Sequence, residues 1–278
     1  MAMVRDVLVV IGVGGMGQAI ARRLGSGRSL LLADYDEDAL DTFASALAGD
    51  GHHVQTSQLD VSDAESVARL AATAQESGPV RHLVHTAGLS PVQATSEAVI
   101  RVDLLGVAYV LEEFAKVIAP GGAGVVIASM AGHMAPNVDA EEERQLAVTP
   151  ARELSGLACL DLARHPDSGL AYSYAKRANQ LRVRAASVEW GRRGARVNSI
   201  SPGVISTPMG QAELGGPAGS FMRAMVDASG TARLGTPDDI AAAADFLLGP
   251  MASFVTGTDL LVDGGVIGAM TTGQMEFG

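Results

Sequence analysis

The chain has 278 residues, of which 47% are hydrophobic and 4% aromatic, and its formal net charge is −11. This length suits one large α/β domain, and the negative charge argues against nucleic acid or an anionic membrane as a partner. The single cysteine, Cys159, excludes an internal disulfide and makes a cysteine-based metal site a poor interpretation.

The first apolar stretch leads directly into glycines and a helical pattern, which is typical of a buried strand and not of a signal peptide. No apolar run reaches transmembrane length, so we expect a cytoplasmic protein. Short β-rich runs then alternate with helical patterns, which predicts a parallel sheet built from βαβ units. The first five strands are expected at residues 6–11, 29–34, 52–60, 81–88 and 123–130. The helices between them are expected at 17–25, 37–49, 62–77 (with a Ser62/Glu65 capping box) and 98–118.

Residues 130–170 carry no strand pattern and predict two short helices, at 139–147 and 149–165, the second with Thr149 as its cap. The acidic start of the first reads as an exposed helix N-terminus, and no metal site is expected. The alternating rhythm then resumes. The last elements are expected as a helix at 171–194, a strand at 195–203, a long loop at 207–232, a helix at 236–249 and a strand at 256–265.

The sequence therefore predicts a single Rossmann-type, doubly wound α/β domain over residues 1–278, with a seven-stranded parallel sheet. A helical insert follows the fifth strand.

A glycine-rich turn joins the first strand to the first helix, in the stretch "IGVGGMG". Its spacing, Gly12-x-Gly14-x-x-Gly17, permits a tight turn and brings backbone N–H groups at a helix N-terminus to a pyrophosphate. Gly15 and Met16 complete the expected phosphate-binding loop. The alternative is a tight strand-to-helix turn without a ligand.

Asp34 ends the second strand, and Tyr35 follows it. A carboxylate here can accept hydrogen bonds from both adenosine ribose hydroxyls and would repel a 2′-phosphate, which favours NAD over NADP. The alternative is that Asp34 only caps the next helix.

Tyr172 and Lys176 lie four residues apart on a predicted helix, in a chain that has only one other lysine, Lys116. Residues at i and i+4 share a helix face. A nearby ammonium lowers the pKa of a phenol and makes it a better acid or base near neutral pH. The alternative is a tyrosine packed on a lysine stem at the helix surface.

These motifs resemble the short-chain dehydrogenase/reductase family over nearly the whole chain. The strand-five serine of the family falls on Ser129, and its Y-x-x-x-K falls on Tyr172 and Lys176. Further positions match residues that contact the cofactor in the family: Asp60, Val61, Ala87, Gly88, Pro202, Gly203, Ile205 and Thr207.

The resemblance implies hydride transfer at a carbinol or carbonyl carbon. Tyr172 would be the general base for alcohol oxidation and the general acid for ketone reduction. Lys176 would bind the nicotinamide ribose and lower the tyrosine pKa, and Ser129 would hold the substrate oxygen.

Asp103 stands where the family has an asparagine whose backbone carbonyl holds a water next to the lysine. The backbone role can survive the change, or the carboxylate can pair with Lys176 and weaken its effect on Tyr172. The glycine loop is also one residue shorter than in the family, and Thr86 replaces an asparagine.

The long segment 130–170 resembles an insert of the bacterial 3α-hydroxysteroid dehydrogenase/carbonyl reductase branch. It could roof the substrate pocket or cover the helices that pair between subunits in the family. The resemblance implies a homodimer or homotetramer and a small hydrophobic alcohol or ketone substrate, steroid-like or alicyclic. The apolar residues Met209, Phe221, Met222 and Met225 suit such a ligand.

Two other functions compete with this one. An NADPH-dependent 3-oxoacyl reductase would need a basic surface for an acidic carrier, and Asp34 and the net charge argue against it. A dinucleotide-binding regulatory protein without activity would not need the set Ser129, Tyr172 and Lys176.

Overall fold

The computed structural model describes residues 5–135 and 138–275 and confirms a seven-stranded parallel sheet. The strands lie in the order β3-β2-β1-β4-β5-β6-β7. Their bounds are β1 Val7–Ile11, β2 Ser29–Asp34, β3 His53–Gln58, β4 Val80–His85, β5 Ile118–Ile127, β6 Arg196–Pro202 and β7 Asp259–Val262. The central strands are buried on both faces, as their near-continuous apolar sequences require.

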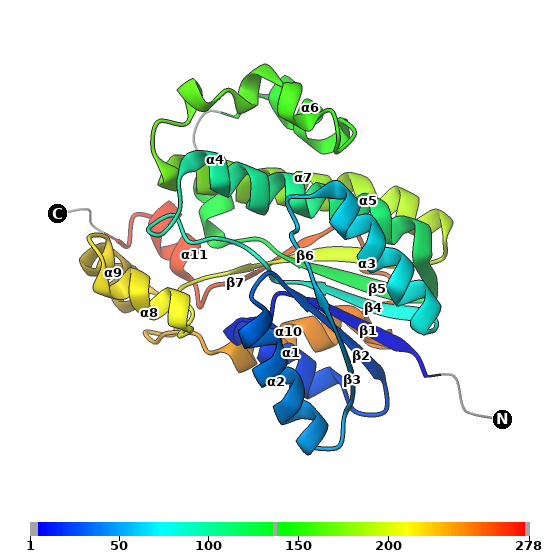
Figure 1. The fold of residues 1–278 in the computed structure, drawn as a ribbon. Helices are drawn as coiled ribbons and strands as arrows, with labels where there is room; N and C mark the ends of the chain where they lie inside the picture. Colours follow the sequence, from blue (N-terminus) through cyan, green and yellow to red (C-terminus); the bar gives the residue numbers. More distant parts are fainter. Residues whose placement is uncertain (1–4, 136–137, 276–278) are drawn as a thin grey trace.

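Helices cover both faces of the sheet (Figure 1). One layer consists of α1 Gly15–Leu24, α2 Glu37–Gly49 and α10 Pro237–Leu248, which share a core with one face. The opposite layer consists of α3 Ala64–Ser77, α5 Val107–Val117 and α7 Ser168–Arg192. Trp190 of α7 is fully buried and donates a hydrogen bond to the carbonyl of Leu111 in α5, which fixes these two helices side by side.

The predicted helix at 98–118 is interrupted. It consists of α4 Ser96–Val99, a π-helical segment over Ile100–Gly106, and α5. The wider π turn matters because it contains Asp103, and such turns recur at functional sites. The chain then enters β5 at Ile118, five residues before the predicted strand.

Helix α3 begins at Ala64 and not at the predicted capping box. The side chain of Asp63 accepts the hydrogen bond from the Glu65 N–H, because a carboxylate next to the first turn satisfies that donor before Ser62 can.

The segment between β5 and α7 contains one α-helix, α6 Ala140–Val148, capped by Asp139. The second predicted helix, at 149–165, is wrong: three short 3₁₀ turns replace it, and Thr149 ends α6 without starting a helix. Extended residues at Leu157 and Asp161 separate the turns. Gly156 gives this stretch little helical preference, so burial of its apolar side chains decides its path.

Residues of this segment pack on the outer side of α7, away from the sheet (Figure 1). Leu146, Leu154 and Leu160 share a buried cluster with Tyr174 and Ala178 of α7. Arg182 of α7 donates to the carbonyls of Leu146 and Thr149. The segment therefore covers a helix face that would otherwise be exposed.

The predicted loop at 207–232 is also wrong, because it contains α8 Pro208–Gly215 and α9 Gly219–Ala228. Thr207 caps α8 by accepting from the Gly210 N–H, with Pro208 in the first turn. A similar Thr-Pro start was correctly predicted for α10, where Thr236 and Asp239 form a capping box. A short helix, α11 Val266–Thr271, follows β7. No helix among residues 5–135 and 138–275 is long and apolar enough to cross a membrane.

Candidate active site

A cavity of about 640 Å³ opens at the carboxyl ends of β1, β2 and β4, where the strand order reverses direction. Ligands of open α/β sheets bind at this point. Eleven of the predicted cofactor residues line it: Gly12, Gly14, Gly15, Met16, Asp34, Tyr35, Asp60, Val61, Ala87, Gly88 and Thr207.

The glycine loop has the geometry of a phosphate cradle. Gly12 has a φ of +93°, and a Cβ there would lie 2.5 Å from the Ala87 nitrogen. A Cβ at Gly17 would lie 1.9 Å from the Gly12 oxygen, so Gly17 is needed for packing, and it does not line the cavity. Gly14 caps α1 without a side-chain hydrogen bond, lines the cavity and has nothing within 4 Å of its missing Cβ, so the start of α1 is open to a ligand. These residues fit a dinucleotide pyrophosphate.

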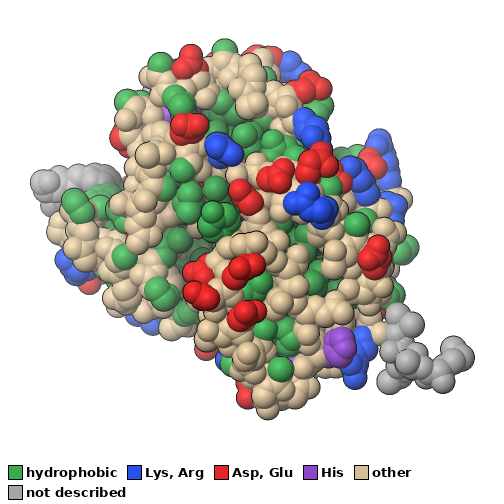
Figure 2. Space-filling model, viewed as in Figure 1, with side chains coloured by type: hydrophobic (Ala, Val, Ile, Leu, Met, Phe, Trp, Pro, Cys, Tyr) green, Lys and Arg blue, Asp and Glu red, His purple; other side chains and the backbone are tan. Residues whose placement is uncertain are grey.

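Asp34 holds this loop in place. Its carboxylate accepts the Val13 N–H at 2.7 Å and the Asp36 N–H at 3.1 Å. Asp36, and not Asp34, caps α2 by accepting from the Ala39 N–H. Tyr35 beside it is 72% exposed. Figure 2 shows further acidic side chains near the start of α2, and the sequence there continues with Glu37 and Asp38.

A buried ion pair lies behind the cavity. The Asp103 carboxylate is 0% exposed and lies 3.2 Å from the Lys176 ammonium, while its other oxygen accepts the Leu89 N–H at 2.7 Å. Burial raises the pKa of Asp103, and Lys176 opposes this rise. Burial lowers the pKa of Lys176, but Asp103 and Tyr172 together raise it by more. The net pKa is raised, so the ammonium keeps its proton.

Lys176 also reaches Tyr172, one helical turn earlier on α7. Its nitrogen lies 5.2 Å from the centre of the phenol ring. The pKa of Tyr172 is raised, mainly by burial, while Lys176 and a hydrogen bond with Ser129 lower it and the charge of Asp103 raises it. The structure thus brings Ser129, Tyr172, Lys176 and Asp103 into one electrostatic cluster.

Gly88 connects this cluster to the cavity. It lines the cavity wall, and a Cβ placed on it would lie 3.3 Å from both the Lys176 nitrogen and an Asp103 oxygen. Ser129, Tyr172 and Lys176 themselves are not among the residues that line this cavity.

Three predicted cofactor residues lie apart from the cavity. Pro202 ends β6, and Gly203 and Ile205 line a separate space of about 200 Å³ near Asp263. A Cβ on Gly203 would lie 2.6 Å from the Asp263 Cα, so this glycine allows two chain segments to approach each other.

Two polar groups near the site were missed by the sequence analysis. Arg101 lines the cavity and donates to Ser62, which lines it too. Glu213 of α8 accepts a 2.7 Å hydrogen bond from the buried Ser90, and its charge raises the pKa of Tyr172. The position of Arg101, two residues before Asp103, could have indicated that it lies near the site. Glu213 lay in a stretch predicted as a loop.

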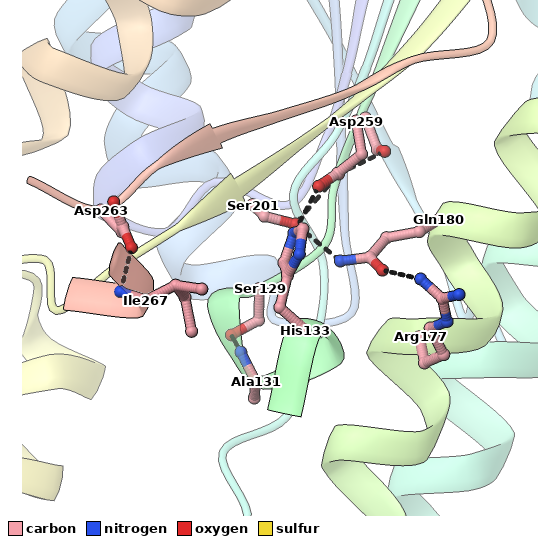
Figure 3. A network of polar contacts seen from close by, with 10 residues as sticks. Ser129, Ala131, His133, Arg177, Gln180, Ser201, Asp259, Asp263 and Ile267 are labelled. Carbon is pink, nitrogen blue, oxygen red and sulfur yellow. Dashed lines mark hydrogen bonds and ion pairs between the residues drawn. The ribbon is translucent and has the colours of Figure 1, made fainter. Parts of the chain in front are cut away.

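The turn that follows Ser129 is held by a polar network (Figure 3). The Ser129 hydroxyl accepts the Ala131 N–H, and His133 lies 2.8 Å from Asp259 of β7. Asp259 also accepts from Ser201, which Gln180 of α7 contacts. These contacts tie the serine-bearing turn to β6, β7 and α7.

Known proteins are similar to this chain in both fold and sequence. Residues 5–140 match the family described as short chain dehydrogenase, and residues 159–267 match the one described as enoyl-(acyl carrier protein) reductase. A short-chain dehydrogenase/reductase of Alternaria brassicicola, bsc3, is 41% identical, with 95% of this chain and 97% of that protein covered.

A 3-alpha-hydroxysteroid dehydrogenase/carbonyl reductase of Comamonas testosteroni is 31% identical over 78% of this chain and 88% of that protein. A crystal structure of a short-chain dehydrogenase/reductase (glucose/ribitol dehydrogenase) from Brucella melitensis is 30% identical. It superposes with a TM-score of 0.74 and covers 94% of this chain and 96% of that one. The chain belongs to the short-chain dehydrogenase/reductase family, an oxidoreductase family that binds nicotinamide dinucleotides.

Proposed function

We propose that this protein is an NAD-dependent oxidoreductase that transfers a hydride between the nicotinamide and a secondary alcohol or ketone. The observation that carries the proposal is the cluster of Tyr172, Lys176 and Ser129 directly behind Gly88, at the wall of the cavity that the glycine loop lines. NAD supplies the hydride acceptor, or NADH the donor, when it is bound. The chain's own residues provide proton transfer and orientation.

In this proposal the Tyr172 phenolic oxygen takes the hydroxyl proton of an alcohol, or gives a proton to a ketone oxygen. The Ser129 hydroxyl donates a hydrogen bond to that same substrate oxygen and fixes its position. Lys176 binds the ribose hydroxyls of the cofactor and stabilises the phenolate. Lysine is suited to this place because its charge is compact.

Asp34 supports NAD as the cofactor. Its carboxylate lines the cavity and already positions the glycine loop, and a 2′-phosphate next to it and its acidic neighbours would be repelled. The alternative cofactor is NADP, and Arg101 favours it because it is a cation in the cavity lining. NADP would in turn favour a reductase of acyl groups, the activity named in the family description that matches residues 159–267. The net charge of −11 argues against docking of an acidic carrier.

The substrate class that fits best is a small alicyclic or steroid-like alcohol or ketone. Apolar residues of α8, α9 and α11 form one cluster with Met130, the residue after Ser129. Met209 of α8 lines the large cavity. The relatives act on hydroxysteroids, on galactitol and on cis-4-hydroxycyclohexanecarboxylate, according to their names. We also propose a homodimer or homotetramer, on the family resemblance.

Parallel thermal-shift titrations with NADH and NADPH test the cofactor. A ligand at about 100 times its Kd that binds only the folded protein adds about 2.7 kcal/mol of stability. We expect this response with NADH and little with NADPH. A stronger response to NADPH would contradict the assignment of Asp34 and point to Arg101.

Tyr172→Phe tests the chemistry. We expect NAD reduction by a panel of cyclic secondary alcohols and hydroxysteroids to fall at least about 100-fold, because the proton acceptor is lost. NADH binding in the same variant should persist. Normal turnover by this variant would exclude Tyr172 as the acid–base group.

A further inference from the structure

The buried group that the proposed mechanism leaves unused is the Asp103 carboxylate. It is fully buried, in the π-helical turn between α4 and α5, and lies 3.2 Å from the Lys176 ammonium. A buried carboxylate next to a buried ammonium is retained only when both are held by further contacts. The contacts around this pair show what it can do.

Asp103 is anchored through both its side chain and its backbone. One carboxylate oxygen accepts the Leu89 N–H, in the loop that follows β4. Its backbone carbonyl accepts a hydrogen bond of 2.8 Å from the buried side chain of Asn179, three residues after Lys176 on α7. The carbonyl has a partner on α7, and the carboxylate lies against the lysine.

No other carboxylate within the described residues pairs with Lys176. The charge of Lys176 also acts on His85 of β4, whose pKa is lowered to about 3, first by burial and then by Lys176, so this histidine is neutral. Both ring nitrogens of His85 lack a hydrogen-bond partner, and so does the side-chain oxygen of Asn179. Asp103 is thus the counter-charge of the catalytic lysine.

Four groups of the described residues act on the Tyr172 phenol. They are Lys176 on α7, Asp103 on the π turn, Ser129 after β5 and Glu213 on α8. Lys176 favours the phenolate, and the two carboxylates favour the phenol. Asp103 acts most directly because it also holds the ammonium itself.

On the basis of the proposed function, we propose that Asp103 is a positioning residue. It fixes the Lys176 ammonium behind Tyr172 and opposes its effect on the phenol, so that, together with burial of the ring, it favours the protonated phenol and sets the site for carbonyl reduction. Alcohol oxidation, which needs the phenolate, is then favoured only at higher pH. The proton balance is unchanged: the phenol gives its proton to the carbonyl oxygen as the hydride reaches the carbon.

Asp103→Asn tests this because it removes the charge with little change in shape and keeps the backbone carbonyl that Asn179 contacts. The ionisation of Tyr172 is followed by ultraviolet difference titration, with Tyr172→Phe subtracting the other tyrosines. We expect the midpoint to fall by about one pH unit or more. The pH profiles of alcohol oxidation and ketone reduction should move down with it. Glu97→Gln, an equal charge change at an exposed position of α4, should move neither.

An unchanged Tyr172 midpoint in folded Asp103→Asn would overturn the inference. If Asp103→Asn alone does not fold, because it leaves Lys176 unpaired, Lys176→Gln and the double variant Asp103→Asn/Lys176→Gln replace it. The double variant should titrate at lower pH than Lys176→Gln, and equal midpoints would overturn the inference. The phenol titration does not need turnover, so a wild-type protein without dehydrogenase activity would contradict the proposed function and leave this test intact.

Discussion

Asp34 shows how one side chain combines structure and recognition. Its carboxylate accepts the Val13 N–H of the glycine loop and also lines the cavity. We expect Asp34→Ala to leave a backbone donor without its partner. The free energy of unfolding should fall by about 1–2 kcal/mol, and NADH binding should weaken.

Asp36→Ala is the matched control for that prediction. It removes the cap of α2 and should cost about 1 kcal/mol, but Asp36 does not line the cavity and NADH affinity should hold. Urea unfolding and NADH titration of both variants measure the two effects. Equal losses of NADH affinity would show that Asp34 acts only through the fold.

The sequence predicted which side chains share a helix face better than it predicted their contacts with other elements. The spacing of Tyr172 and Lys176 on one helix face is a local property, and the structure brings them together as expected. The choice between the carbonyl and the carboxylate of Asp103 depended on Asn179 and on a π turn. Neither has a local sequence signature, so the sequence alone did not show that the Asp103 carboxylate pairs with Lys176.

At the scale of elements, the segment between β5 and α7 is held by apolar packing more than by helical preference. Leu154 is 0% exposed in the cluster that this segment forms with α7. We expect Leu154→Ala to lower the free energy of unfolding by about 2–5 kcal/mol. Because no residue of this segment lines the large cavity, NADH affinity should be unchanged.

Val148→Ala is the control within the same segment, since Val148 is 59% exposed at the end of α6. It should change stability by less than about 0.5 kcal/mol. Chemical unfolding of both variants measures the difference. A small effect of Leu154→Ala, similar to that of Val148→Ala, would contradict the packing described for this segment.

The elements that sequence reasoning predicted well are those with strong periodicity. Strands such as β1 and β2 are apolar runs between turns, and α10 has a complete capping box. The failures have physical reasons. Residues 149–165 follow a path set by burial against α7, and α8 was missed although Thr207 and Pro208 start it in the manner of Thr236 and Pro237.

At the scale of the whole molecule, two histidines of β4 make the fold sensitive to acid. Burial, and then Arg28, lower the pKa of His82 to about 4, and burial, and then Lys176, lower that of His85 to about 3. Below about pH 6.5 the unfolded chain binds more protons at these positions than the folded one does, so stability falls as the pH falls. Between its unfolded and its folded pKa, each histidine lowers the free energy of unfolding by roughly 1.4 kcal/mol for each unit that the pH falls.

Urea unfolding at about pH 7 and about pH 5 measures this slope. His85→Asn should reduce it, because the substituted residue does not titrate. An identical slope in wild type and His85→Asn would show that His85 is not the acid-sensitive group.

The most direct test of hydride transfer with Tyr172 as the acid is the fate of an isotope. The wild-type protein is incubated with NADH deuterated at the transferred position and with a cyclic ketone or a 3-oxosteroid, and the alcohol is examined by mass spectrometry. We predict deuterium on the carbinol carbon with wild type and a rate at least about 100-fold lower with Tyr172→Phe. Absence of deuterium in the alcohol, or equal rates for the two proteins, would contradict the account.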